Sequence, residues 1–366
     1  MEIIVSRENL LPILNRIIPV VERRQTIPIL GNLLLQAYEE SLTIIGTDLE
    51  IEIKSLCQSD VIDSGDGTIP ARKFGDICRS LMEGSEIRIK ISNERCILTA
   101  GRGRYVLGTL PANDFPTMES LNPKVKIEIE EGVLRRMLDK TAFAMAQQDV
   151  RYYLNGLLFQ ADNTGLRVVA TDGHRLASYF HSCQLQLQDI YSIIIPFKTV
   201  TELRRQLSYV NNTVLVEFSE RIIRISFQGT VSSSKLIDGR YPEYERVIPA
   251  GLMKVATTNR EILKKALSRA AILSNEKYRG LRVIFESGVL RLIAHNPEQE
   301  EAVEEMELNY NGETTVIGYN VSYLSDLLGA IDSTEVEVHF NDGNSSSLWR
   351  GVGETGEIYV VMPMRL

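Results

Sequence analysis

The sequence predicts an α+β fold made of three tandem copies of one structural unit. Three landmarks recur along the chain in the same order and at nearly constant spacing, and short amphipathic segments alternate with strand-like runs in each third. A length of 366 residues suits two or three domains, and 44% hydrophobic with 24% charged residues is typical of folded chains. Each third can therefore bury a core of its own.

The first landmark is an amphipathic helix at the start of each third, where apolar residues recur with helical spacing in residues 8–14, 133–138 and 262–267. The second landmark is a hairpin-like pair of strands that ends in a turn of the Thr-Asp type. The three turns lie 124 residues apart in both steps, at Thr47-Asp48, Thr171-Asp172 and His295-Asn296.

The third landmark is a strand that runs directly into a second helix, at Ile69–Lys73, Ile195–Lys198 and Ile317–Asn320. Strands of alternating polarity then close each unit, for example over residues 87–91, 214–218 and 336–340. Each unit therefore reads β-α-β-β-β twice. This order predicts antiparallel sheets with the helices segregated on one face.

Two linkers separate the units. Helical and strand periodicity lapses among Pro, Asn and Gly over residues 113–124 and again over 242–252. The predicted domains are 1–122, 123–246 and 247–366.

Charge is distributed unevenly between the predicted helices and the rest of the chain. The formal net charge is -8, which taken alone argues against a nucleic-acid partner. The predicted helices nevertheless sum to +8, which leaves -16 for the remainder; they are residues 7–24, 72–83, 134–140, 198–205, 260–269 and 320–332. Surface helices often carry Lys and Arg for solvation alone. Alternatively, helices on one side of repeated sheets form a common basic face that attracts phosphates without reading bases.

No sequence-reading motif accompanies these helices, so the basic face predicts non-specific binding to duplex DNA. The competing hypothesis is a DNA-modifying enzyme that uses the same face. Such an enzyme would need clustered carboxylates for Mg²⁺ or a Walker-type loop. The acidic residues are scattered, and Gly101-x-Gly103 lacks a third glycine. We therefore expect no catalytic residue, metal or cofactor.

Asp172 and His174 are the one pair that could act as acid and base. The alternative is a β-turn in which Asp and Gly supply the turn geometry. Because no nucleophile motif or metal-ligand partner accompanies the pair, the turn is the favoured interpretation.

The cysteine content and the absence of long apolar runs indicate where in the cell the protein is found. Four cysteines without CxxC spacing suit reduced thiols. Charge appears early at the N-terminus, and no apolar run approaches the ~18 residues of a membrane helix. We expect a cytoplasmic protein with no membrane partner.

Several continuous runs carry a family resemblance: IPILGNLLL (27–35), GTDLE (46–50), QDVRYYLNG (148–156), ATDGHRLA (170–177), AAILSNEK (270–277) and the terminal VMPMRL (361–366). With these runs the chain resembles the bacterial sliding clamps, the beta subunits of DNA polymerase III, over essentially its whole length. The resemblance implies a head-to-tail homodimer whose six domains close a ring around duplex DNA, with sheets outside and helices inside. It also implies three kinds of partner protein: the replicative polymerase, a clamp loader and other proteins that carry short clamp-binding peptides.

The resemblance further implies a pocket for those peptides. Two Met residues, aliphatic side chains and Pro make an adaptable apolar groove for Leu and Phe anchors. The matching positions are Leu154, Thr171, Gly173, His174, Arg175, Leu176, Pro242, Arg246, Val247, Asn320, Tyr323, Ser346, Val360, Met362, Pro363, Met364, Arg365 and Leu366. The alternative for Met362–Met364 is a final core strand, a role that we expect Val360 and Val361 to fill in part.

For DNA contacts, the positions that match the family are Arg24, Gln148, Tyr152 and Tyr153. Arg72, Lys198 and Arg240 are added on charge and placement. The two tyrosines could stack on single-stranded bases, or they could be ordinary buried residues.

For the dimer, the segment that begins at Gly101 predicts an edge strand, which invites pairing with another chain. The resemblance pairs this edge with the third domain of a partner copy, so that Tyr105 and Leu107 meet Ile272 and Leu273. Basic residues would then face acidic ones: Lys73, Arg102 and Arg104 against Glu298, Glu300, Glu301 and Glu304. Without that pairing the acidic run is a solvated loop.

Overall fold

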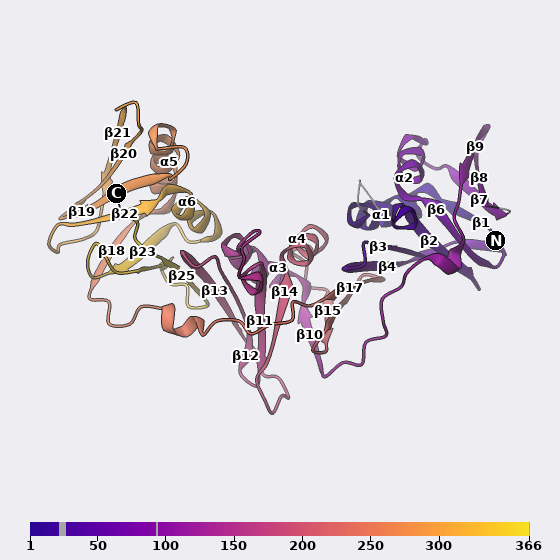
Figure 1. Cartoon of the computed structure of the whole chain (residues 1–366), viewed down its shortest axis with the longest axis horizontal. Coiled ribbons are helices and arrows are strands. Elements are labelled where there is room, and N and C mark those ends of the chain that lie inside the picture. The colour runs from indigo at the N-terminus through magenta and orange to yellow at the C-terminus, as the bar shows by residue number, and fades with distance from the viewer. Residues whose placement is uncertain (22–26, 93, 366) are drawn as a thin grey trace. The chain divides into compact units, whose positions relative to one another are not determined.

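The computed structural model describes residues 1–21, 27–92 and 94–365, and within them it confirms the predicted repeat (Figure 1). The order β-α-β-β-β occurs twice in each third, with β5 as an additional short strand. Neighbouring strands pair in antiparallel fashion. No helix of the described residues is long and apolar enough to span a membrane.

The elements of the first third are β1 (Glu2–Ser6), α1 (Arg7–Ile17), β2 (Asn32–Tyr38), β3 (Ser41–Thr47), β4 (Ile51–Gln58), β5 (Asp60–Asp63), β6 (Gly65–Pro70), α2 (Ala71–Ser80), β7 (Glu86–Ser92), β8 (Arg95–Ala100) and β9 (Gly103–Gly108). Those of the central third are β10 (Val125–Glu130), α3 (Glu131–Thr141), β11 (Gly156–Asp162), β12 (Gly165–Thr171), β13 (Arg175–Ser182), β14 (Tyr191–Pro196), α4 (Phe197–Gln206), β15 (Thr213–Phe218), β16 (Ile222–Phe227) and β17 (Thr230–Lys235). The last third contains β18 (Lys254–Asn259), α5 (Arg260–Ala270), β19 (Gly280–Glu286), β20 (Val289–His295), β21 (Glu301–Glu307), β22 (Thr315–Asn320), α6 (Val321–Ala330), β23 (Glu335–Phe340), β24 (Ser347–Gly351) and β25 (Glu357–Val361).

Two eight-stranded sheets cross the predicted domain borders. In one sheet β17 of the central third pairs with β4 of the first, and in the other β13 pairs with β25 of the last third. The chain accordingly forms two compact units, residues 1–132 with 205–236 and residues 133–204 with 237–366. Each unit takes half of the central third, because backbone hydrogen bonds join that third to both of its neighbours.

The turns of the second landmark have the same local structure in different thirds. Asp48 Oδ1 accepts hydrogen bonds from the backbone N–H groups of Glu50 and Ile51, at 2.8 and 2.7 Å. Asn296 Oδ1 likewise accepts from the N–H of Glu300 at 2.9 Å. A short acceptor side chain thus closes the turn between β3 and β4 and again between β20 and β21.

Helix starts also repeat. Ser6 accepts the N–H of Asn9 at 3.2 Å to cap α1, and Asn259 accepts the N–H of Ile262 at 3.0 Å to cap α5. Both residues follow a strand directly, so the chain passes from extended to helical backbone in one step. In the first unit, α1 and α2 then bury their apolar faces against strands of both sheets in a single core.

The first predicted helix was too long. Instead of running over residues 7–24, α1 ends at Ile17. Pro19 has no N–H group to donate to the carbonyl of Asn15, which stops the helical hydrogen-bond ladder. Arg205 takes over that carbonyl and donates from Nη1 to Asn15 O at 3.0 Å. The end of the predicted segment, including Arg24, lies outside the described residues.

The predicted charge of the third helical segment, residues 134–140, was wrong because of Lys140. We counted it on the basic face, but its side chain is buried, with 4% of the residue exposed. Its Nζ lies 2.8 Å from Glu357 Oε2 and 3.0 Å from Asp332 Oδ2, with Glu354 Oε2 at 3.8 Å. Burial lowers the pKa of Lys140, yet the hydrogen bonds and charges of these carboxylates raise it on balance. Lys140 therefore joins α3 to β25 and is not free to meet phosphates.

Glu357 is the most deeply buried member of this cluster, with 1% of the residue exposed. Burial raises the pKa of its carboxyl group to about 7, against the opposing effect of Lys140. A carboxyl group whose pKa is raised on folding stabilises the folded state while it is protonated. That contribution is complete below the unfolded pKa of about 4.5 and is lost as pH rises to about 7.

Glu357→Gln should therefore flatten the pH dependence of stability. Between pH 4.5 and 7 we expect the change in unfolding free energy to shrink by up to about 3 kcal/mol relative to the wild type. Chemical denaturation followed by fluorescence of Trp349, the single tryptophan, measures it. Glu335→Gln, at an exposed strand position, is the matched control. An unchanged pH slope in Glu357→Gln would contradict the assignment.

Candidate functional site

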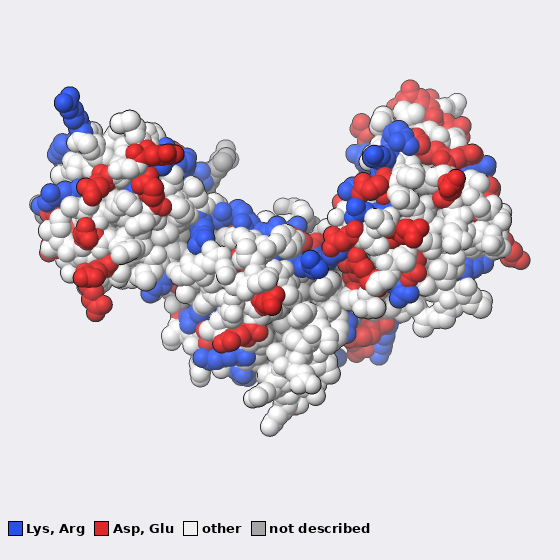
Figure 2. All heavy atoms as spheres, turned by 180° about the vertical axis from the view of Figure 1, so that it is seen from behind, with Lys and Arg blue, Asp and Glu red and all other residues white. Residues whose placement is uncertain are grey.

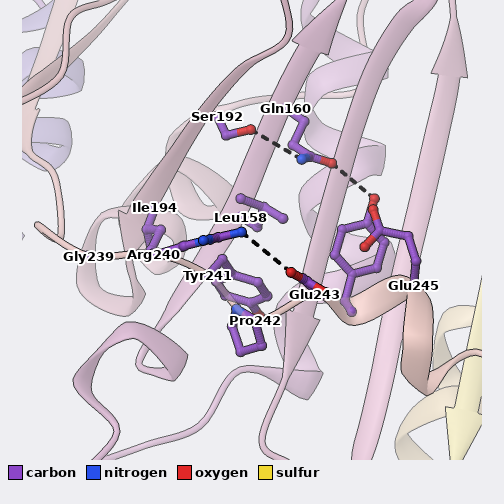
Figure 3. A pocket seen from close by; sticks show the side chains of 11 residues that line it. Leu158, Gln160, Ser192, Ile194, Gly239, Arg240, Tyr241, Pro242, Glu243 and Glu245 are labelled. Carbon is purple, nitrogen blue, oxygen red and sulfur yellow. Dashed lines mark hydrogen bonds and ion pairs between the residues drawn. The ribbon is translucent and has the colours of Figure 1, made fainter.

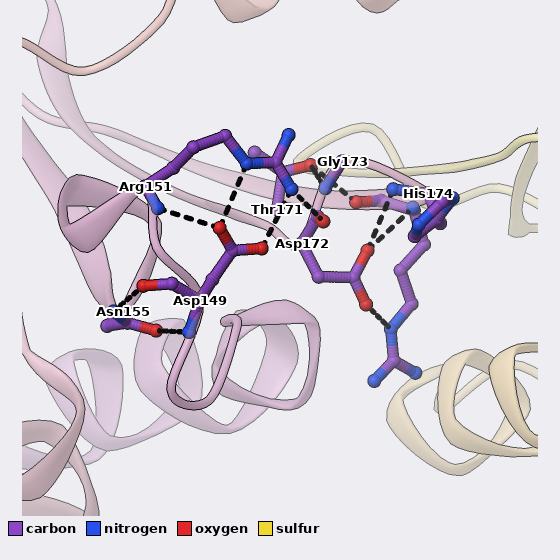
Figure 4. A network of polar contacts seen from close by, with 8 residues as sticks. Asp149, Arg151, Asn155, Thr171, Asp172, Gly173 and His174 are labelled. Carbon is purple, nitrogen blue, oxygen red and sulfur yellow. Dashed lines mark hydrogen bonds and ion pairs between the residues drawn. The ribbon is translucent and has the colours of Figure 1, made fainter.

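The turn from Thr171 to Arg175 carries the residues that could have been an acid–base pair (Figure 4). Asp172 Oδ1 accepts the backbone N–H groups of His174 and Arg175 at 2.9 and 3.0 Å, and its Oδ2 pairs with Arg175 Nε at 3.1 Å. Thr171 Oγ1 accepts the N–H of Gly173, whose φ of +88° suits glycine. Both carboxylate oxygens of Asp172 are thus used in holding the turn, as the turn interpretation predicts.

The 148–156 segment is fastened to this turn (Figure 4). Arg151 binds both carboxylate oxygens of Asp149 at 3.0 and 2.8 Å and also donates from Nη2 to the carbonyl of Asp172 at 3.1 Å. Asn155 donates to the carbonyl of Asp149 and accepts its N–H. The hydrogen bonds from Arg151 lower the pKa of the Asp149 carboxyl to about 2. Gln148 directly precedes these hydrogen-bonded residues and has a left-handed backbone with φ of +57°.

Arg175 connects the turn to the last third of the chain. Its guanidinium donates to Asp326 Oδ2 at 2.5 Å and to the Phe143 carbonyl at 2.7 Å. It also lies 4.5 Å from the centre of the Tyr323 ring on α6, a favourable cation–π geometry. The His174 ring lies parallel to the same Tyr323 ring, with centroids 6.5 Å apart. These contacts bring three predicted pocket residues together.

An apolar cluster lies beneath these polar groups. Leu154, Leu176 and Val360 are almost fully buried in it, and Val247 packs against it while partly exposed. These residues come from four segments far apart in the sequence, and the prediction that they share one site is consistent with this packing. The cluster is part of the apolar core of the second unit.

The C-terminal tail runs along this site in extended form. β25 ends at Val361, and Val360 and Val361 are core residues of that strand. Met362 and Met364 follow it outside any strand, half-buried, so the alternative of a core strand does not hold for them. Their backbone N–H groups donate to the carbonyls of His174 at 2.9 Å and Gly318 at 2.7 Å. The tail is thus held by its backbone, and this attachment does not use the methionine side chains.

The other predicted pocket residues differ in exposure and in the elements that carry them. Asn320 caps α6 by accepting the N–H of Ser322 at 2.9 Å. Ser346 lies in the loop before β24, and Arg246 is exposed and pairs with Glu243 at 2.6 Å. Pro363 and Arg365 belong to the half-buried and exposed parts of the tail. Leu366 lies outside the described residues.

Pro242 and Arg240 line a pocket of about 390 Å³ beside the apolar cluster, because Tyr241 and Tyr244 belong to both (Figure 3). Leu158 and Ile194 also line it, and the side-chain amide of Gln160 donates to Ser192 Oγ at 3.1 Å. Arg240 reaches Glu243 at 3.4 Å in the same pocket. Sequence reasoning missed this pocket, because its walls come from β11, β14 and residues 239–245 after β17, and no local pattern joins them.

The predicted DNA contacts differ in exposure. Tyr152 is 55% exposed, whereas Tyr153 packs against the apolar cluster, with its ring 5.7 Å from that of Tyr152. The stacking role therefore suits Tyr152 better. Arg72 is exposed on α2 and donates to the Val21 carbonyl at 3.3 Å, and Lys198 is exposed near the start of α4. Arg24 lies outside the described residues.

The helices of the central third carry a basic surface. Figure 2 shows Lys and Arg side chains gathered where α3 and α4 lie. Arg135 and Arg204 both reach the Asp139 carboxylate at 2.5 Å, which neutralises part of this charge. Arg136 and Lys198 extend from the same helices and are exposed. The surface is basic without Lys140.

β9 and β21 are edge strands of their sheets, one in each compact unit. β9 pairs only with β8 and β21 only with β20 among the described strands. Two other sheet edges are partly covered: Ile237 donates to the Ile194 carbonyl at the edge of β14, and Thr257 of β18 exchanges hydrogen bonds with Asn309. β9 and β21 are thus available for pairing with another chain.

The side chains near these edges differ in sign. Arg102 and Arg104 are exposed beside β9, and Lys73 is exposed on α2. Tyr105 and Leu107 pack partly against the core of the first unit. In the second unit Ile272 is 77% exposed, next to a half-buried Leu273.

The acidic residues beside β21 are partly engaged within the chain. Glu304 accepts two hydrogen bonds from Arg269, at 2.7 and 2.5 Å. Glu301 lies 3.4 Å from His295 Nε2, and Glu300 accepts from the Asn296 amide. Glu298 is exposed. Glu304 is therefore already paired, a feature that the sequence pattern did not reveal.

Comparison with known proteins gives a consistent assignment. Family models of the DNA polymerase III beta subunit match residues 1–119 (N-terminal domain), 128–243 (central domain) and 245–365 (C-terminal domain). Curated beta sliding clamps of Pseudomonas putida and Pseudomonas aeruginosa are 45% and 46% identical to the chain, with complete coverage of both sequences. The crystal structure of the DNA polymerase III subunit beta from Pseudomonas aeruginosa superimposes with a TM-score of 0.97 at 45% identity, covering both chains fully.

These matches confirm the predicted fold of three tandem clamp domains. The order of the matched ranges follows the three repeats found in the sequence. The chain belongs to the family of DNA polymerase III beta subunits, the bacterial sliding clamps.

Proposed function

We propose that two copies of this sliding clamp pair head to tail through β9 and β21 and close a ring around duplex DNA. The observation that carries the proposal is the pair of uncovered edge strands, one in the first third and one in the last. A contact between two different surfaces of identical chains generates a ring when its rotation closes. Basic residues beside β9 and acidic residues beside β21 favour the pairing of unlike edges.

Helix number supports a ring of suitable size. Two copies bring twelve α-helices, because α1 to α6 lie among the described residues of one. Twelve helices of about 10 Å width around a circle leave a hole of roughly 28 Å, enough for a duplex and a layer of water. The basic surface over α3 and α4 would face the DNA backbone, with Arg72, Gln148, Lys198, Arg240 and the exposed Tyr152 as further contacts. Such contacts neutralise phosphates without reading bases.

The groove beside the C-terminal tail supports peptide binding. It combines a buried apolar floor with two methionines and the Tyr323 ring, a surface that adapts to apolar side chains. We infer that the replicative polymerase, a clamp loader and other DNA-processing proteins bind here through short peptides with Leu and Phe anchors. We also infer a cytoplasmic location, which fits four free cysteines.

The sliding clamp family consists of processivity factors, not enzymes, which confirms the prediction of a non-catalytic protein. The alternative of a DNA-modifying enzyme is wrong for the same reason. The domain limits 1–122, 123–246 and 247–366 stay a prediction.

Ring closure predicts a topological link to DNA. Loaded by a clamp loader and ATP onto nicked circular DNA, the protein should co-elute with the DNA in gel filtration and be released when the circle is cut. Linear DNA without end blocks is the control. Retention on free-ended linear DNA would contradict encirclement.

The edge pairing predicts that Ile272→Glu with Leu273→Glu yields monomers, because two buried carboxylates in an apolar contact are unfavourable by several kcal/mol. Analytical ultracentrifugation should show a lower sedimentation coefficient for this variant. Ile262→Glu, at a position on α5 that is 54% exposed and is not among the predicted interface residues, should remain dimeric. An unchanged sedimentation coefficient of the double variant would count against the interface.

The tail groove predicts that truncation after Val361 abolishes peptide binding while the dimer persists. The truncation removes both methionines and the two backbone hydrogen bonds that fix the tail. Fluorescence anisotropy with a labelled peptide carrying Leu and Phe anchors should show at least a tenfold loss of affinity, or about 1.4 kcal/mol. Met253→Ala, at an exposed methionine outside the groove, serves as control. Full affinity after truncation would refute the pocket.

A further inference from the structure

A second cavity, of about 440 Å³, lies at the end of the tail groove. It is lined by Asn275, Tyr278, Gly280, Arg282, Ile293, His295, Met364 and Arg365. Its size falls in the range of pockets that hold ligands or side chains. Of its lining residues, only Met364 and Arg365 belong to the predicted peptide pocket.

The cavity has a fixed frame. Arg282 of β19 and Ile293 of β20 are directly opposite each other in the sheet. The Tyr278 wall is held by Asn275, whose Oδ1 accepts the N–H groups of Lys277 and Tyr278 at 2.9 Å each. These contacts place an arginine next to an aliphatic and an aromatic side chain.

The tail joins this cavity to the peptide groove. Met364 lines the cavity, and its N–H donates to the carbonyl of Gly318 at 2.7 Å. Gly318 is in turn the partner of Arg282 in the pairing of β22 with β19. A peptide in the groove would therefore continue past Met364 toward Arg282.

The rim of the cavity carries positive charge. Arg282 and Arg365 are exposed, and no ion pair is formed by either with another described residue. Lys277 adds an ammonium group 5.3 Å from the Tyr278 ring. One lining residue has an acidic neighbour: His295 Nε2 lies 3.4 Å from Glu301 Oε1. Arginines without partners bind carboxylates well, because the guanidinium can donate two parallel hydrogen bonds.

We infer that this cavity is a specificity subsite for an acidic side chain that flanks the apolar anchor of a partner peptide. The inference rests on the proposed peptide groove. An Asp or Glu side chain fits both features of the cavity: its methylene groups contact Ile293 and Met364, and its carboxylate meets Arg282 and Arg365. Peptides with an acidic flank therefore bind more tightly than peptides with a neutral or basic one.

The test compares three labelled peptides that share one Leu and Phe anchor and differ in flanking residues, with two Glu, two Gln or two Lys on either side. Affinities are measured by fluorescence anisotropy with the full chain. The wild type should prefer the Glu flank over the Gln flank by about threefold to tenfold, since exposed charge pairs contribute modestly. Arg282→Ala should remove most of this preference, and Arg282→Glu should reverse it in favour of the Lys flank.

The outcomes separate this inference from the proposed pocket. Arg95→Ala, at an exposed arginine of β8 in the other compact unit, is the matched control and should keep the wild-type preference. Equal affinity of the wild type for all three peptides would overturn the acidic subsite and leave the groove intact. Failure of every peptide to bind would overturn the groove itself. An acidic preference that Arg282→Glu leaves unchanged would move the acidic subsite away from this cavity and so refute it.

Discussion

Backbone hydrogen bonding across domain borders is the constraint on which the rest of the structure depends. β17 adds to β4, and β13 adds to β25, so that each border between repeats is also the middle of a sheet. Repeats that share a sheet are therefore joined by backbone hydrogen bonds across their border. β9 and β21 lie at edges of the other two sheets, in the first and last thirds, and an edge strand can pair with another chain.

The fold was largely predictable because the same strand, helix and turn signals occur in each third of the sequence. A strand followed directly by a capped helix, as at Ser6 and Asn259, is a local signal, and a short acceptor side chain at Asp48 or Asp172 specifies a turn wherever it occurs. The end of α1 at Ile17 was missed although Pro19 marks it in the sequence. The contact by which Arg205 takes over the carbonyl of Asn15, 190 residues away, could not be read from local pattern.

The candidate site was predictable to a different degree. The residues of the tail groove were identified by family resemblance, and the structure brings Leu154, Leu176, Val247 and Val360 together in one cluster. The resemblance did not reveal how the charges are used. Lys140 is buried among carboxylates, and Glu304 is already paired with Arg269. The sequence alone does not show whether a charged side chain is exposed or already paired, because its ion-pair partners lie on other elements.

The pairing of β25 with β13 has a consequence for the order of folding. Arg175 of β13 lies opposite Val361 of β25, 186 residues further along the chain. Such non-local strand pairs form slowly, because a long loop must close before the contact is gained. Until β25 pairs, one edge of β13 is open and the carbonyl of His174 lacks the N–H of Met362. The groove that we propose for partner peptides is therefore among the last parts of the second unit to form.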